Sequence, residues 1–181
     1  MGTYGQRPTR VSKQTFEEPA LLKDIDTIVQ YARKGGYYSG EILDLDSALS
    51  MFNDIKVEYV PMDQTQSGEL FCENGTWIIR INQKHNKKRQ RFTLAHELGH
   101  YILHKEKNAG FKDAVFFRNE ILDSMEYSAN EFASNLLMPE SSVKKYIDVE
   151  GIRNIGQLAD VFGVSAAAMK YRILSLGYTL K

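Results

Sequence analysis

The sequence has one cysteine, no excess of charge of either sign and no long hydrophobic run. The single thiol, Cys72, excludes an intramolecular disulfide and is consistent with a reducing compartment. The 23 basic and 23 acidic residues balance, so no overall field attracts nucleic acid or an anionic membrane. No stretch reaches the ~20 apolar residues of a membrane span, and the polar N-terminus lacks the apolar core of a signal peptide. We therefore expect a soluble, cytoplasmic protein without membrane or direct nucleic-acid partners.

The chain length of 181 residues predicts one domain with a sizeable core. Residues 1–18 are polar and aperiodic, which predicts a flexible tail, and residues 19–181 are expected to form the domain. Within it, the region from about 140 to 177 is expected to be a helical C-terminal part.

Local patterns predict an α+β fold, with a small antiparallel sheet packed against a long helix and a largely helical C-terminal part. Pro19 suits the first turn of a helix that ends at Gly35-Gly36, and a second helix is expected from about 46 to 52. Residues 55–59 alternate between apolar and charged side chains, as in a half-buried strand. Asn74-Gly75 separates two strand-like runs, 69–72 and 76–81, and is a strong hairpin signal.

The most informative motif is His96-Glu97-Leu98-Gly99-His100, inside an apolar helical pattern. Residues four apart share one face of a helix, so the two imidazoles can bind one tetrahedral metal from the same side. Glu97 would then lie beside the metal, where a general base can take a proton from water and return it to the leaving amine. The motif predicts a zinc site with His96 and His100 as ligands and Glu97 as the catalytic base.

Catalytic zinc needs a third protein ligand and leaves one position open for water. The extended three-histidine pattern is excluded because position 106 is Glu106. His104 lies eight residues after His96, a further rotation of about 80° away from the metal face. We expect it to be a residue of the helix end that interacts with the helix dipole.

Glu126 is the better third ligand, because it opens a second helical segment at a usable distance. Asn130 is four residues further on and on the same face, where it can hydrogen-bond the second nitrogen of a liganding histidine. Glu131 points about 140° away and is expected to face solvent. Glu120 and Asp123 remain weaker alternatives. The segment 114–117, between the two helices, is expected to be a strand or a hydrophobic flap over the cleft.

These residues resemble the ImmA/IrrE family of bacterial metallopeptidases over roughly residues 20 to 177. The resemblance rests on the runs Arg91–Tyr101, Glu126-x-x-Ala129-Asn130-x-Phe132-Ala133 with 136–139, and Leu158-Ala159-x-x-Phe162-Gly163-Val164-Ser165 with Met169-x-x-Arg172. It implies a gluzincin-like fold with one zinc held by His96, His100 and Glu126. It also implies cleavage of a helix-turn-helix repressor encoded nearby, which frees a mobile-element, phage or stress regulon. Finally, it suggests that Arg91 makes an internal ion pair, and that a sheet edge beside the metal pairs with the substrate.

The C-terminal part offers a rival interpretation, since Gly163 and Ser165 are placed to end one helix and cap the next, as in a helix-turn-helix DNA reader. Its second helix begins with three alanines and adds only Lys170 and Arg172 in charge, which favours a packing or docking role. The basic run 84–91 lacks interleaved aromatics and is expected to be a solvated loop and helix entry.

The sequence therefore predicts a zinc-dependent endopeptidase with limited specificity for a cytoplasmic protein. The alternatives are a repressor- or DNA-binding module, or a toxin–antitoxin component, that has kept a zinc site. The donor that assists zinc in stabilising the oxyanion stays open among Tyr101, Arg118, Tyr127, Tyr171 and Arg172.

Overall fold

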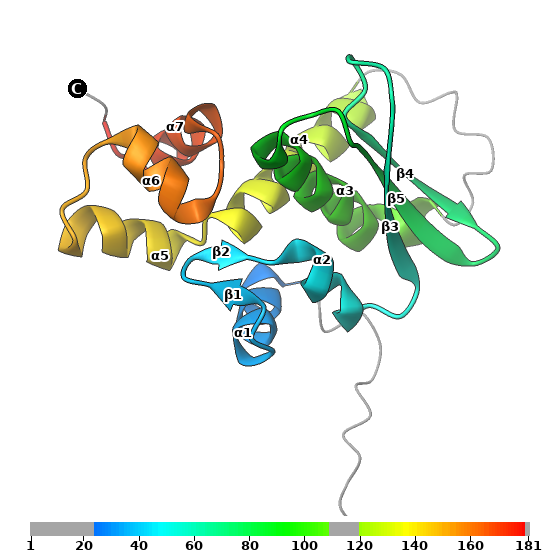
Figure 1. Ribbon diagram of the computed structural model, residues 1–181, viewed down its shortest axis with the longest axis horizontal. Coiled ribbons are helices and arrows are strands. Elements are labelled where there is room, and N and C mark those ends of the chain that lie inside the picture. Colours follow the sequence, from blue (N-terminus) through cyan, green and yellow to red (C-terminus); the bar gives the residue numbers. More distant parts are fainter. Residues whose placement is uncertain (1–23, 109–119, 180–181) are drawn as a thin grey trace, which may run out of the picture.

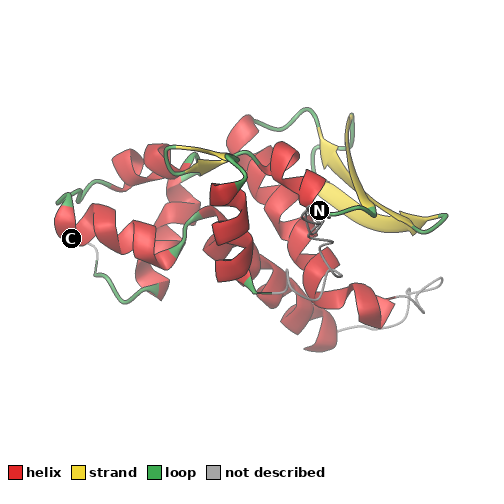
Figure 2. Cartoon of the chain, turned by 90° about the horizontal axis from the view of Figure 1, so that it is seen from below, coloured by secondary structure: helices red, strands yellow, loops and turns green. Residues whose placement is uncertain are grey.

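The computed structural model describes residues 24–108 and 120–179. A three-stranded sheet lies at one end of the molecule, helices α5–α7 lie at the other, and α3 and α4 run between them (Figures 1 and 2). The elements are α1 (Ile25–Lys34), β1 (Tyr38–Ser39), β2 (Ile42–Leu43), α2 (Leu45–Ala48) with a 3₁₀ turn (Leu49–Met51), β3 (Ile55–Val60), β4 (Gly68–Glu73), β5 (Thr76–Asn82), α3 (Lys87–Asn108), α4 (Glu120–Leu137), α5 (Glu140–Lys144) with a π-helical turn (Lys145–Val149), α6 (Ile155–Phe162) and α7 (Ala166–Ser175). The predicted α+β class is confirmed.

The main sheet has the order β3-β5-β4. The predicted hairpin is present as β4 and β5, joined by Asn74 and Gly75 with φ values of 50° and 80°. Positive φ at both positions is the geometry that makes Asn-Gly favourable in a two-residue hairpin turn. The sheet is mixed rather than wholly antiparallel, because β3 runs parallel to β5.

The mixed topology follows from the loop 61–67, which crosses the end of β5 to carry the chain from β3 to β4. Asn82 is fully buried at that end of β5. Its side-chain amide donates to the carbonyls of Asp63 and Gln66 at 2.8 Å each. Its oxygen accepts from the backbone N–H groups of Met62 at 3.3 Å and Lys84 at 3.0 Å. These contacts satisfy a buried amide and fix the loop that leads into β4.

The core lies between the inner face of this sheet and the helices. Ile79 and Ile81 of β5 are fully buried, whereas Arg80 between them points to the opposite, outer face. From α3, Leu94 and Leu98 are buried at helical spacing in the same hydrophobic cluster. The expected packing of the sheet against the motif-bearing helix is therefore present.

Helices α3 and α4 approach each other closely at Gly99. A Cβ atom built on Gly99 would lie 3.1 Å from a ring carbon of Phe132 and 3.2 Å from the Cα and carbonyl oxygen of Ala129. Ala129 is itself fully buried. Two small residues thus allow close contact between the helices at the position directly before His100.

The N-terminal helix α1 is capped by Asp24, whose carboxylate accepts from the Thr27 N–H at 3.0 Å. The helix ends at Gly35, as predicted, but the predicted start at Pro19 and the tail 1–18 lie outside the described residues. The predicted second helix is α2 with its 3₁₀ turn. The short hairpin of β1 and β2 was not predicted.

The C-terminal helices have the predicted turn. Gly163 is left-handed, with φ 64° and ψ 34°, and the Ser165 side chain accepts from the Ala168 N–H at 3.1 Å. Arg172 is buried in α7 and donates to the backbone carbonyl of Met138, beyond the end of α4, at 3.0 Å. Within 24–108 and 120–179, no helix combines the length and the apolar composition that a membrane crossing requires.

The helix contact makes a testable prediction about Ala129. Ala129→Leu should lower the free energy of unfolding by about 1–3 kcal/mol, because the added carbons overpack the contact with Gly99. Denaturant unfolding with a chelator present measures this without a metal contribution. Ala167→Leu, on an exposed face of α7, is the matched control and should change the free energy by less than about 0.5 kcal/mol. Equal stability of the two variants would contradict this account of the contact.

Candidate metal centre

Three predicted ligands converge from two helices. His96 and His100 lie one turn apart on α3, and their Nε2 atoms are 3.1 Å apart. The Glu126 carboxylate on α4 lies 3.3 Å from His96 Nε2 and 3.1 Å from His100 Nε2. Within the described ranges, only these three residues form a group of histidine, cysteine or acidic side chains with metal-ligand spacing.

The spacing of these atoms fits a tetrahedral metal. Ligands about 2.0–2.1 Å from a tetrahedral zinc ion lie about 3.3 Å from one another. The three observed separations of 3.1, 3.1 and 3.3 Å are close to that value. Two imidazole nitrogens and one carboxylate oxygen also form a donor set that borderline-soft zinc accepts, and the fourth position stays open.

Asn130 contacts the ring of the first histidine. Its side-chain oxygen lies 3.0 Å from His96 Nδ1, so the ring donates from Nδ1 and keeps the lone pair of Nε2 for a metal. Asn130 reaches this position because it is one turn after Glu126 on the same face of α4. The contact has the geometry expected for Asn130, and its role beside a bound metal stays a prediction.

The second histidine is held in its neutral form. Burial lowers the pKa of His100 to about 4, and the neighbouring imidazole of His96 contributes to the same shift. A neutral imidazole is the form that binds a metal, so no proton has to leave His100 at neutral pH.

Glu97 lies next to His96 on α3 and is 9% exposed. Burial raises the pKa of its carboxyl to about 7, and the negative charges of Glu126 and Glu69 add to the shift. A carboxyl whose pKa is close to neutral can both accept and return a proton, which suits a general base. Glu126, by contrast, has a 55% exposed side chain in contact with both imidazoles.

His104 lies away from this group of ligands. It is buried in α3, and its Nε2 is 3.1 Å from the hydroxyl of Ser128 on α4. His104 lies four residues before Asn108, the last residue of α3, and belongs to the contact between the two helices. Glu131 is exposed, as expected.

Helix α4 begins at Glu120, so Glu126 lies within the helix rather than at its start. The weaker candidates Glu120 and Asp123 therefore belong to α4, although their side chains are outside the described part. The predicted strand or flap at 114–117 is also outside it.

Arg91 does not make the predicted ion pair with any described residue. Its guanidinium donates to the backbone carbonyl of Leu43 at the end of β2. Burial lowers the pKa of Arg91, while Tyr38 and Asp44 act in the opposite direction. The side chain thus ties the first turns of α3 to the β1-β2 hairpin through a backbone acceptor.

Two of the open oxyanion candidates are excluded by their positions. The buried Tyr101 donates to Asp54 and accepts from Lys105 at 3.0 Å. Arg172 is bound to Met138 and is equally unavailable. Tyr127 and Tyr171 are 59% and 56% exposed and remain candidates, whereas Arg118 lies outside the described residues.

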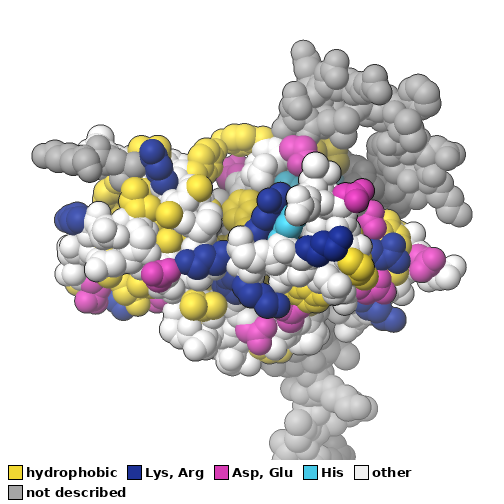
Figure 3. All heavy atoms as spheres, turned by 45° about the horizontal axis from the view of Figure 1, so that its top comes forward, with side chains coloured by type: hydrophobic (Ala, Val, Ile, Leu, Met, Phe, Trp, Pro, Cys, Tyr) yellow, Lys and Arg dark blue, Asp and Glu magenta, His cyan; other side chains and the backbone are white. Residues whose placement is uncertain are grey.

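The basic run before the motif lies at the surface and makes internal contacts. Lys88 forms an ion pair with Asp160 at 2.7 Å, and Arg89 donates to the Ser67 hydroxyl. Figure 3 shows Lys and Arg side chains near the middle of one face of the molecule, with Asp and Glu side chains around them. The two contacts agree with a solvated helix entry.

Glu69 lies on β4 and contributes to the raised pKa of Glu97, although no sequence motif marks it. Gly68, its neighbour, packs against α3, because a Cβ there would lie 2.6 Å from Thr93 Cγ2. Thr93 is one turn before Glu97. The edge strand that lies beside the site is therefore β4 rather than β3, the strand at the other edge of the sheet. No local sequence pattern indicates which of the two edge strands this is.

A His-Glu-x-x-His helix that meets a glutamate from a second helix, beside a small sheet, defines the zincin-like class of metal centre. The family model described as the IrrE N-terminal-like domain of the M78 peptidases matches residues 53–174, and the chain belongs to this family. The suspected relationship to ImmA and IrrE is thereby confirmed.

Two curated relatives are named as metallopeptidases. The metallopeptidase ImmA of Bacillus subtilis is 33% identical over 102 residues, covering 56% of this chain and 57% of the relative. The radiation response metalloprotease IrrE of Deinococcus radiodurans is 35% identical over 101 residues, covering 53% of this chain and 30% of the relative. An immunity region protein of Bacillus phage phi105 is 35% identical over 98 residues, covering 54% and 59%. The matched region thus spans between 30% and 59% of these relatives.

A solved structure with the same fold is a Mycobacterium tuberculosis transcriptional regulator. The TM-score is 0.62 at 17% sequence identity, over 82% of this chain and 46% of that one. At this identity the similarity concerns the fold alone.

The metal centre makes a prediction about binding. Replacing His96 or His100 with alanine should abolish stoichiometric zinc, because two ligands do not hold the ion against buffer and water. Glu126→Ala should weaken zinc binding, and Glu131→Ala, one of the exposed carboxylates of the same helix, should leave it unchanged. Elemental analysis and competition with a chelator measure both effects. Full zinc content in both histidine variants would show that these residues do not form the metal site.

Proposed function

We propose that the protein is a zinc-dependent endopeptidase that makes a limited cut in a helix-turn-helix repressor, encoded nearby and controlling a mobile-element, phage or stress regulon. The observation that carries the proposal is the convergence of His96, His100 and Glu126 at ligand spacing beside the buried Glu97. Two relatives named as metallopeptidases and a third named for an immunity region support the reaction and the regulatory setting. The balanced charge and single cysteine favour work in the cytoplasm.

Each residue has a distinct part in the proposed reaction. A bound zinc ion would act as a Lewis acid on the scissile carbonyl and lower the pKa of water. Glu97 accepts the proton of the attacking water on its carboxylate and then delivers it to the amide nitrogen of the leaving group. Asn130 holds His96 in the required tautomer through Nδ1. Tyr127 and Tyr171 are the described donors left for the developing oxyanion.

The substrate segment would add to the edge of the sheet at β4. Within the described chain, β4 pairs with β5 on one side only. Asn82 N–H donates to the Ser67 carbonyl at 2.9 Å, so Ser67 and Asn82 form a hydrogen-bonded pair. From Ser67 onward, hydrogen-bonded and non-hydrogen-bonded pairs with β5 therefore alternate along β4. The N–H and C=O groups of Gly68, Leu70 and Cys72 consequently point to the open edge. A peptide that pairs with them lies extended beside α3, as hydrolysis requires.

Strand addition also explains why the cut is limited. A folded partner offers an extended segment only where its backbone is not already bonded, in linkers or locally unfolding regions. A segment between the DNA-binding and dimerising parts of a repressor meets this condition. DNA binding by this chain itself is disfavoured, because Arg172 of α7 is buried against Met138.

Glu97→Gln should abolish most peptidase activity while zinc content stays unchanged. Glutamine keeps the shape of the side chain but cannot accept the proton, and such transfer typically contributes about 10²- to 10⁴-fold in rate. Steady-state cleavage and elemental analysis, made on the same preparation, separate chemistry from metal binding. Glu131→Gln is the control on the exposed face of α4. Cleavage by Glu97→Gln at the parental rate would exclude Glu97 as the base.

The zinc-loaded protein should cut the neighbouring repressor at one position and should cut casein poorly. Incubation of the purified proteins, with and without chelator, followed by mass spectrometry of the fragments, tests both statements. A stoichiometric complex without cleavage, unaffected by Glu97→Gln, would instead indicate a binding module or a toxin–antitoxin component. Comparable degradation of many folded proteins would indicate a general protease.

A further inference from the structure

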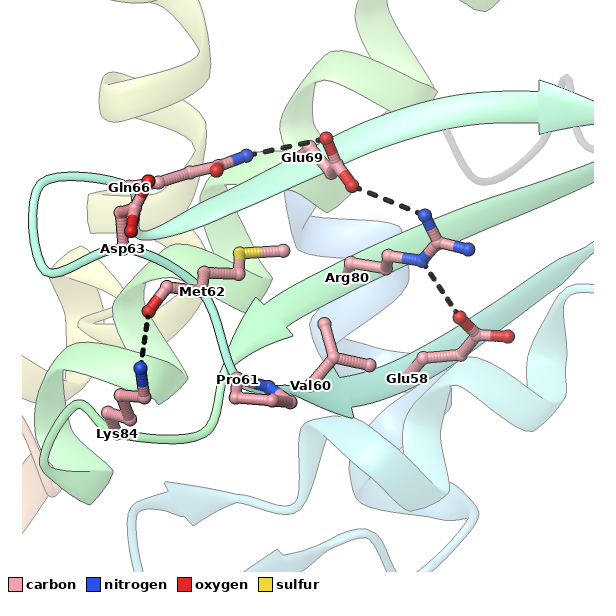
Figure 4. Close-up of a pocket in the computed structure, with 9 residues that line it drawn as sticks. All are labelled: Glu58, Val60, Pro61, Met62, Asp63, Gln66, Glu69, Arg80 and Lys84. Carbon is pink, nitrogen blue, oxygen red and sulfur yellow. Dashed lines mark hydrogen bonds and ion pairs between the residues drawn. The ribbon is translucent and has the colours of Figure 1, made fainter.

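The outer face of the main sheet carries a row of charges that ends at the edge beside the metal centre. Glu58 of β3, Arg80 of β5 and Glu69 of β4 are partners in register across the three strands. Figure 4 shows both carboxylates reaching Arg80 from opposite sides. The three residues line a hollow of about 580 Å³. All three side chains are between 38% and 44% exposed, so a ligand can reach them.

The charges in this row do not cancel. Arg80 Nε is 3.0 Å from Glu58, whereas Arg80 Nη1 is 3.5 Å from Glu69. The other contact of Glu69 is with the neutral Gln66 amide at 3.3 Å. One guanidinium thus serves two carboxylates, and the weaker contact leaves negative charge at Glu69.

Glu69 also has the backbone position that brings its side chain closest to an added strand. Its N–H and C=O face β5, because the hydrogen-bonded pairs of the hairpin fall on Ser67, Glu69, Phe71 and Glu73. A peptide residue directly opposite Glu69 on the open edge therefore forms a non-hydrogen-bonded pair. In such pairs the Cα atoms are about 4.5 Å apart and the side chains meet on the same face of the sheet.

We infer that Glu69 is a specificity-determining residue that selects a basic side chain in the segment added to β4. The inference rests on the proposed strand addition to this peptidase. Opposite charges across such a pair contribute about 0.2–1 kcal/mol, and like charges oppose pairing by a similar amount. We therefore expect lysine or arginine to be favoured over a neutral residue by about 1.4- to 5-fold, and aspartate or glutamate to be disfavoured.

The test measures peptide capture separately from chemistry. Zinc-loaded Glu97→Gln protein is immobilised and incubated with a peptide library made by cleavage after aromatic residues, so that charged residues remain inside the peptides. Mass spectrometry gives the ratio of basic to acidic residues in retained and unretained peptides. Glu69→Lys, added to Glu97→Gln, should invert the preference of the parent. Glu58→Lys is the matched control. It changes the net charge by the same amount and also removes a carboxylate that contacts Arg80, but it lies on β3 at the opposite edge of the sheet.

The only thiol of the chain reports where the peptides bind. Cys72 is exposed on β4, so a peptide paired with this strand should slow its alkylation, and an excess of acidic peptides should slow it less. The inference would be overturned if Glu69→Lys and Glu58→Lys changed the ratio of basic to acidic residues in the retained peptides equally. It would also be overturned if the parent showed no basic preference, or if bound peptides did not protect Cys72.

A parallel digestion of the same library by the wild-type protein separates the two proposals. If the wild type cleaves peptides but shows no preference for a basic residue at a fixed distance from the cut, the peptidase activity is supported and the role of Glu69 is excluded. If peptides are captured in a Glu69-dependent way and protect Cys72, but neither the library nor the repressor is cleaved, the role of Glu69 in specificity is supported and the peptidase activity is excluded.

Discussion

The contact of α3 with α4 at Gly99 and Ala129 is the constraint on which the site depends. Helices with larger side chains at their crossing are kept about 8–10 Å apart, and small residues let the backbones approach more closely. Because Ala129 is fully buried there, Glu126 and Asn130 flank the crossing and face the histidines of α3. The ligands are therefore brought together by apolar packing within the fold. Because packing of the core already orders these side chains, a metal ion that binds them causes little further loss of conformational entropy.

The same packing gives two glutamates different environments. Glu97 lies against the core, where burial and neighbouring carboxylates raise its pKa to about 7. Glu126 extends into an open region and contacts both imidazoles through its two oxygens. These two environments suit the roles proposed for the two carboxyl groups, proton carrier for Glu97 and metal ligand for Glu126.

Features set by neighbours in the sequence were predictable, and features set by distant contacts were not. Asn74-Gly75 determines its hairpin, and the i, i+4 spacing of His96 and His100 determines a shared face, because both depend on a few consecutive residues. The direction of β3 depends on a buried side chain, Asn82, that pins the loop 61–67. Likewise, Arg91 bonds to Leu43, a partner 48 residues away, which a motif cannot reveal. The third ligand could be chosen from spacing and family resemblance, but only the packing of α4 places its carboxylate.

The C-terminal helices show why a local motif does not define a function. The turn at Gly163 and the cap at Ser165 have the geometry that a helix-turn-helix requires. In a DNA reader the second helix presents basic side chains to the groove, yet here Arg172 points inward and holds the carbonyl of Met138. The motif thus anchors the C-terminal end of α4, while Ala129 anchors its middle. The contacts at Ala129 and Met138 both come after Glu126 in the chain. The position of the Glu126 carboxylate therefore depends on packing of the later turns of α4.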